Sequence, residues 1–134
     1  MYKHQTEIRV RYGETDQMGF VYYGNYPLYY EVGRVEALRS LGLNYSKMEE
    51  EGVALPVREL KINYYKPAFY DQFLRMETWL EEMPKTRIRF HHHIYNEENV
   101  LLNYGEVELV FMNIATKRPV ICPENLRSAL EKYF

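Results

Sequence analysis

Hydrophobic and polar residues alternate in five separate segments of the chain. The first segment covers residues 6–12. Its residues Ile8, Val10 and Tyr12 share one face and charged side chains occupy the other, which is the period-two pattern of a half-buried strand. Four later segments alternate in the same way: residues 60–65, 73–82, 86–96 and 100–113. Short polar turns separate the last three segments, which favours antiparallel hairpins.

A different period follows the first strand, because hydrophobic and small residues there are spaced by three and four. This pattern predicts one long helix that begins at residue 24 or 26 and ends at Leu41. Pro27 suits the first turn of the helix, Asn25 suits its N-terminal cap, and Gly42 suits its end. Shorter helices are predicted at residues 44–52 and 125–134.

The order of the elements is one strand, one long helix and then four strands, which predicts an α+β fold with the helix packed on a curved antiparallel sheet. Gly33 lies inside the helix, where glycine costs about 1 kcal/mol relative to alanine, so we expect a close approach to the sheet there. One helix cannot cover five long strands. Outward-facing residues such as Arg89, His91 and His93 must therefore meet solvent or another subunit, and we expect a homo-oligomer.

Composition limits the possible partners and compartments. The length of 134 residues fits one domain over residues 1–134. The formal net charge is −2 and no long basic run is present, so nucleic acid is not an expected partner. Cys122 is the only cysteine, so no internal disulfide can form. No segment has the apolar length of a signal peptide core or a membrane span, and we expect a cytoplasmic protein without membrane insertion.

The stretch before the long helix carries the most informative chemistry. Asp16 precedes Tyr23 and Gly24, which stand at the predicted helix start. The first N–H groups of a helix lack helical acceptors, and the helix dipole adds positive charge there, so these amides suit a developing oxyanion. An ionised Asp16 beside them can attack a carbonyl carbon or take a proton from water. On the residues alone, an aspartate in such a loop is more commonly a turn or cap residue.

The same stretch resembles the signature of a known enzyme family. The matching elements are Glu14-Thr15-Asp16, Gly19, Val21-Tyr22, Gly24, Asn25-Tyr26 and the aromatic start of the helix at Tyr29-Tyr30-Glu31. Further matches are Tyr64-Tyr65-Lys66-Pro67-Ala68, Arg118-Pro119 and Pro123. Together they resemble the hot-dog-fold acyl-CoA thioesterases of the 4-hydroxybenzoyl-CoA thioesterase type, over nearly the whole chain.

The resemblance implies a five-stranded curved antiparallel sheet wrapped around one long helix, with a short C-terminal helix. It implies hydrolysis of an acyl-CoA thioester, with Asp16 as nucleophile or general base and the backbone N–H of Tyr23, with Gly24 adjacent, as oxyanion donor. It also implies a homodimer or tetramer with active sites between protomers, and no metal or redox cofactor, since coenzyme A is part of the substrate. Cations that match positions holding the coenzyme A phosphates, partly from a neighbouring subunit, are Lys85, Arg87, Lys117 and Arg118.

Two other functions stay open at this point. The fold can serve as a non-catalytic acyl-CoA or acyl-carrier binding module. A hydratase or dehydratase on the same fold is less favoured, because those enzymes need a histidine-containing acid–base pair and no histidine lies in the loop before the helix.

Several further residues have simpler interpretations than catalysis. Glu14 is expected to be a solvated loop acid, and Glu31 a helix N-terminal acid favoured by the dipole. The run His91-His92-His93 supplies two side chains on one strand face, which do not complete a tetrahedral zinc site, so surface or interface histidines are expected. Cys122 is expected to be a buried bystander. A set of tyrosines is expected in the core and an interface: Tyr22, Tyr23, Tyr26, Tyr29 and Tyr30.

Overall fold

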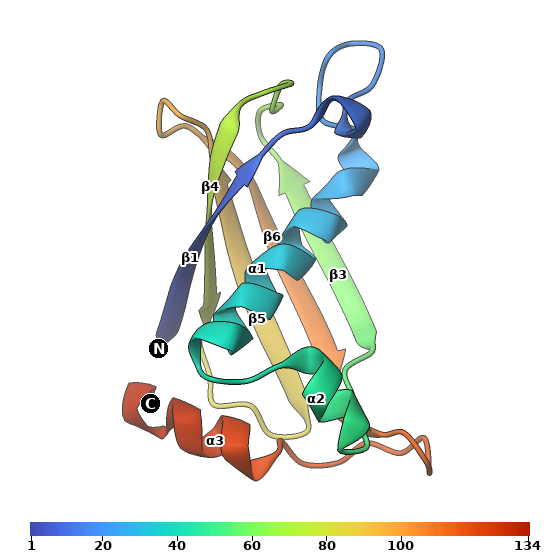
Figure 1. Ribbon diagram of the computed structural model, residues 1–134. Coiled ribbons are helices and arrows are strands. Elements are labelled where there is room, and N and C mark those ends of the chain that lie inside the picture. The colour runs from blue at the N-terminus through green and yellow to red at the C-terminus, as the bar shows by residue number, and fades with distance from the viewer.

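Five long strands form one antiparallel sheet in the computed structural model, which describes residues 1–134, and their spatial order is β1-β4-β5-β6-β3 (Figure 1). The strands are β1 (Tyr2–Arg9), β3 (Val57–Tyr64), β4 (Phe73–Leu80), β5 (Arg87–Tyr95) and β6 (Leu101–Val110). A second, two-stranded sheet pairs β2 (Val53–Ala54) with β7 (Met112–Asn113). The helices are α1 (Tyr26–Ser40), α2 (Tyr45–Glu50) and α3 (Glu124–Leu130), and 3-10 turns cover Tyr12–Glu14, Tyr23–Asn25 and Glu131–Tyr133.

Helix α1 crosses one face of the sheet and packs against β1, β4 and β5 (Figure 1). The close approach predicted at Gly33 is confirmed, because a Cβ atom there would lie 2.6 Å from Thr78 Oγ1 and 2.8 Å from Met76 Cε. The helix ends next to Gly42, which has a φ of +84°, as the sequence predicts. Thus α1 covers the part of this face formed by β1, β4 and β5, and it covers the part near β3 less.

The first strand differs from its prediction. It begins at Tyr2, which pairs with Leu80, and it ends at Arg9, which pairs with Phe73. Val10 still exchanges backbone hydrogen bonds with Gln72 and Asp71, but Asp71 has a φ of +68° and turns its segment away, so the pairing stops there. Tyr12, placed on the buried face by its spacing, lies in a 3-10 turn and is 77% exposed.

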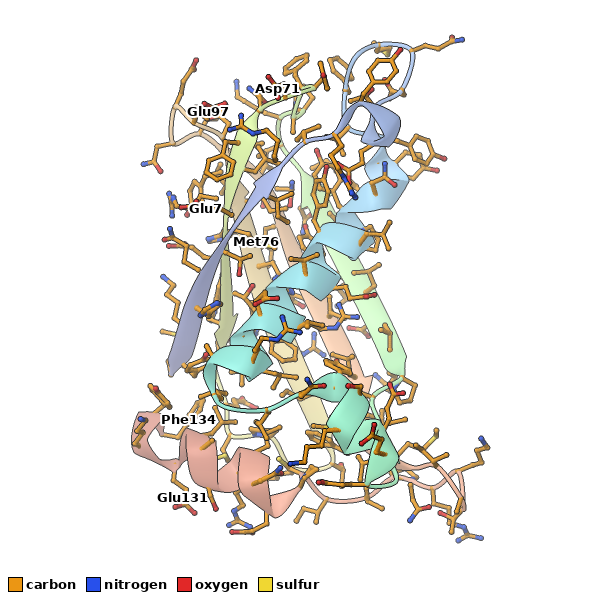
Figure 2. All side chains as sticks on the ribbon, in the orientation of Figure 1. Glu7, Asp71, Met76, Glu97, Glu131 and Phe134 are labelled. Carbon is orange, nitrogen blue, oxygen red and sulfur yellow. The ribbon has the colours of Figure 1, made fainter.

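The last predicted strand, residues 100–113, is divided into two. It breaks at Phe111, which is fully buried, and Met112 and Asn113 then pair with β2 in the second sheet. The C-terminal helix is confirmed as α3 followed by a 3-10 turn. Figure 2 shows Glu131 and Phe134 of this segment at the opposite end of the molecule from Asp71. None of the helices has the combined length and apolar character that crossing a lipid bilayer requires.

The three consecutive histidines do not lie at the surface as a group. His92 faces α1 and is fully buried, with its ring stacked 4.6 Å from that of Tyr30 and Nδ1 2.9 Å from Thr78 Oγ1. Burial holds the pKa of His92 well below its usual range. His91, on the outer face, is only 6% exposed because Trp79 of the same chain stacks on it. The prediction of surface or interface histidines is therefore wrong for His92, which lies in the core, whereas His91 lies on the outer face of the sheet.

Candidate active site

The loop before α1 folds into a small hairpin with Asp16 near its tip. Thr15 and Val21 form an isolated antiparallel bridge, and the Asp16 N–H donates to the Phe20 carbonyl at 2.8 Å. Gly19 turns the chain with a φ of +80°, a conformation that favours glycine. The hairpin therefore holds Asp16 in a fixed backbone position beside the start of α1.

The carboxylate of Asp16 is anchored through one oxygen only. Oδ1 accepts the N–H of Met18 at 2.9 Å and that of Phe20 at 3.3 Å. The other oxygen, Oδ2, makes no hydrogen bond within the chain. Asp16 itself is exposed, and because one oxygen fixes the orientation of its side chain, the second is free to react or to accept a proton.

Asp16 lines a cavity of about 290 Å³ between the hairpin, the start of α1 and the end of β3. Its other lining residues are Phe20, Val21, Tyr23, Tyr26, Tyr64, Tyr65, Lys66 and Pro67. Asp16 and Tyr23, both singled out from the sequence, thus face one cavity, whereas Gly24 adjoins Tyr23 in the backbone without lining it. The structure also places Tyr64, Tyr65 and Lys66 there, although the sequence had shown them only as part of a matching motif.

The amides at the start of the helix are available to a ligand. A 3-10 turn, Tyr23–Asn25, leads directly into α1. Neither the N–H of Tyr23 nor that of Gly24 donates to a loop carbonyl or to a side chain of the chain. Unpaired amides at a helix start carry partial positive charge, which suits an oxyanion.

Glu14 has a different role from the one expected of a solvated acid. Its side chain is 16% exposed and accepts the backbone N–H of Arg11 at 2.8 Å, the Arg11 guanidinium at 2.9 Å and the Tyr29 hydroxyl at 2.9 Å. Burial alone would raise the pKa of Glu14, but these hydrogen bonds outweigh it and lower the pKa. Asn25, expected as a cap, instead donates its side-chain N–H to the Glu14 carbonyl at 2.8 Å. Glu14 therefore ties the Asp16 hairpin to α1.

The positions of Glu31, Cys122 and the tyrosines test the remaining expectations about single residues. Glu31 lies beyond the first turn of α1, where the amides are already paired, so it is not the helix N-terminal acid that was expected. Cys122 is buried as predicted, and burial raises the pKa of its thiol to about 11. The tyrosine prediction holds for three members in the core (Tyr26, Tyr29 and Tyr30), whereas Tyr22 and Tyr23 are exposed in the single chain.

The cations expected to hold coenzyme A phosphates lie far from Asp16 within one chain. They are Lys85, Arg87, Lys117 and Arg118. Arg87 begins β5 opposite Val110, whereas Tyr64, at the cavity, ends β3 opposite Asn103, so the two mark opposite ends of the sheet. Backbone hydrogen bonds join the segments of the other three cations to the Arg87 end, and Figure 1 shows the loop after β7 at the opposite end from the loop before α1.

Comparison with known proteins identifies the family of this chain. Residues 10–130 match the Thioesterase-like superfamily. The chain belongs to this superfamily. It is 44% identical to YneP of Bacillus subtilis over 96 residues, which cover 72% of this chain and 70% of that protein. It is 35% identical over 119 residues to the acyl-CoA thioester hydrolase YbgC of Escherichia coli, with 89% of each chain covered.

The fold of this thioesterase superfamily member also agrees with a solved structure. The DHNA-CoA thioesterase of Staphylococcus aureus superposes with a TM-score of 0.87 and 36% identity, covering 100% of this chain and 85% of that one. The predicted hot-dog fold is therefore confirmed in its five-stranded antiparallel sheet, its one long helix and its short C-terminal helix.

Proposed function

We propose that this thioesterase hydrolyses acyl-CoA thioesters to a carboxylic acid and coenzyme A, with Asp16 as the reacting carboxylate and the N–H groups of Tyr23 and Gly24 as oxyanion donors. The observation that carries the proposal is that Asp16, anchored through Oδ1 alone, and Tyr23 line the same cavity at the helix start. The similarity to the E. coli acyl-CoA thioester hydrolase supports the choice of a coenzyme A thioester.

The chemistry follows from this arrangement. The thioester carbonyl oxygen accepts the free amides, which stabilise the negative charge that develops on it. Asp16 then either attacks the carbonyl carbon, giving an anhydride that water cleaves, or removes a proton from a water molecule that attacks. In both routes the carbon–sulfur bond breaks, the acyl carbon gains an oxygen from the reaction with water, and the sulfur leaves as coenzyme A thiol. Both routes need the same free oxygen, Oδ2.

We further propose that the enzyme is a homodimer joined along β3. This strand is at the edge of the sheet, and its Leu60 is 41% exposed. On α1, Leu28 is 59% and Val32 43% exposed. A free strand edge and exposed apolar side chains in one molecule favour pairing with a second copy. Two-fold pairing of β3 is antiparallel, so the Val57 end of one copy lies beside the Tyr64 end of the other.

This pairing accounts for the distant cations. The end of the sheet that carries Lys117 and Arg118 in one protomer approaches the Asp16 cavity of its partner. Ammonium and guanidinium groups there meet the coenzyme A phosphates while the thioester lies against Asp16. Each active site then contains residues of both chains. This explains why Lys117 and Arg118 lie far from Asp16 within one chain.

The alternative is a binding module that holds a thioester without cleaving it, and thiol release separates the two. Purified protein is assayed with short, long and aromatic acyl-CoAs, while binding of each is measured by calorimetry. The proposed function requires catalytic thiol release from at least one of them, and sedimentation as a dimer. Tight binding to all with no release above the spontaneous rate would establish the binding module instead.

A further inference from the structure

A hydrogen bond joins the end of β3 to the start of the helix. The hydroxyl of Tyr64, the last residue of β3, donates to the backbone carbonyl of Tyr23 at 3.1 Å. The Tyr64 ring packs edge-on against Tyr23, at 6.4 Å between centroids, and against Tyr26, at 5.6 Å. The sheet therefore contacts the helix start through a directed polar bond as well as through apolar packing.

Pro27 explains why this carbonyl has room for a side-chain donor. In a continuous α-helix, the carbonyl of residue 23 accepts the N–H of residue 27. Proline has no N–H, so Pro27, in the first turn of α1, cannot supply that donor. The phenol of Tyr64 supplies one from a different element of the fold.

The acceptor belongs to the same peptide group as one of the free amides. The carbonyl of Tyr23 and the N–H of Gly24 share one planar unit, and the chain contains no cis peptide bond, so the two groups point in opposite directions. A donor that fixes the direction of the carbonyl also fixes the direction of the N–H. It also polarises the peptide and makes the N–H a better donor, as occurs in chains of hydrogen bonds.

We propose that Tyr64 is a positioning residue, whose hydroxyl fixes the Tyr23–Gly24 peptide and with it the direction of the free Gly24 N–H, which donates to the thioester oxygen from the edge of the cavity that Tyr23 lines. The inference rests on the proposed function, since it assigns a task to a residue of that same site. Burial and the neighbouring Tyr23 raise the pKa of Tyr64, so the hydroxyl keeps its proton at neutral pH and remains a donor.

The test is the variant Tyr64→Phe, which removes the hydroxyl and keeps the ring. Its matched control is Tyr70→Phe, because Tyr70 is 55% exposed, lies outside the cavity and makes no side-chain hydrogen bond. Removing an oxyanion donor altogether typically costs about 10²- to 10³-fold in kcat, and loosening one donor costs less. We expect Tyr64→Phe to lower kcat about five- to ten-fold with KM within two-fold, and Tyr70→Phe to change neither.

A spectroscopic readout separates positioning from a general structural role. The carbonyl stretch of a bound, carbon-13-labelled thioester is recorded by infrared difference spectroscopy in the Asp16→Asn background, where turnover is slow. A carbonyl that accepts a well-aimed N–H absorbs at lower frequency. We expect the band of the bound thioester to move back toward its frequency in water when Tyr64→Phe is added.

The outcomes distinguish this inference from the proposed function. An unmoved carbonyl band, or a raised KM with unchanged kcat, overturns the positioning role, because Tyr64 is then at most a substrate contact. If Asp16→Asn retains full turnover, the proposed function itself fails. If Asp16→Asn loses turnover while Tyr64→Phe keeps both kcat and the carbonyl band, only the inference about Tyr64 fails.

Discussion

The hydrogen bond from the Tyr29 hydroxyl to Glu14 predicts that replacing Glu14 lowers the stability of the fold. A glutamate surrounded by solvent would have no such effect. Tyr29 is only 3% exposed and its hydroxyl donates to Glu14 at 2.9 Å. Glu14→Ala removes the acceptor and leaves a buried hydroxyl without a partner, which costs about 1–3 kcal/mol. Glu14→Gln keeps an oxygen for Tyr29 and loses only the ion pair with Arg11, whose side chain is 80% exposed, so we expect a much smaller loss of stability.

A second substitution identifies the cause of the loss. Tyr29→Phe removes the stranded hydroxyl, so the double variant with Glu14→Ala should recover roughly half of the lost stability. The free energy of unfolding is measured by urea titration at one protein concentration, because an oligomer's stability depends on concentration. If Tyr29→Phe instead adds its own full cost to that of Glu14→Ala, the two side chains are independent and the assigned bond is wrong.

The same carboxylate predicts a pH dependence. Since hydrogen bonds lower the pKa of Glu14 in the folded chain, its contribution to stability is complete above the ordinary pKa of 4.5 and is lost as the pH falls through the lowered value. The stability difference between the wild type and Glu14→Gln should therefore shrink as the solution is acidified below that range. A difference that grows on acidification would contradict the direction of the shift.

Three further predictions test the core and the phosphate contacts. Gly105→Ala should lower Tm by about 5–10 °C, because its Cβ would lie 2.3 Å from the ring of the fully buried Tyr30; an unchanged Tm contradicts this. Native Cys122 should react with a thiol reagent at pH 8 at least about a hundred-fold more slowly than in the urea-unfolded chain, since its pKa is raised from 9.0 to about 11, and equal rates would show an accessible thiol. The double variant Lys117→Ala and Arg118→Ala should raise KM about ten-fold with kcat within two-fold, an effect that weakens at high salt; an unchanged KM removes these residues from the site.

The sequence predicts the parts of the fold that depend on local pattern. Alternation identifies the strands, and it also places His92 on the same face as Ile88 and Phe90, which are both almost fully buried. The error over His92 came from grouping it with its neighbours instead of following that alternation. Asp16 and Tyr23 reach one cavity because few residues separate them, so a local motif is enough to bring them together.

Contacts between distant segments could not be predicted in this way. Glu14 meets Tyr29 across a hairpin whose turn is set by backbone hydrogen bonds. Tyr64 meets Tyr23 because β3 happens to end beside the helix start, a matter of strand length and register. Tyr12 lies off its predicted face because the segment that pairs with β1 turns away at Asp71, opposite Val10, and leaves Tyr12 without a strand partner. Each of these facts depends on where an element ends, which a periodic pattern does not specify.

The most direct measurement of the central claim compares two carboxylate-to-amide substitutions on one substrate. Asp16→Asn removes the free oxygen at the cavity, and Asp71→Asn is its matched control, because Asp71 lies outside the cavity and its side chain makes no hydrogen bond or ion pair within the chain. With binding measured by calorimetry and turnover by thiol release, Asp16→Asn should bind the thioester within a few-fold of the wild type and turn over at least about 10³-fold more slowly, while Asp71→Asn matches the wild type in both. Turnover by Asp16→Asn at the rate of the Asp71→Asn control would contradict the account.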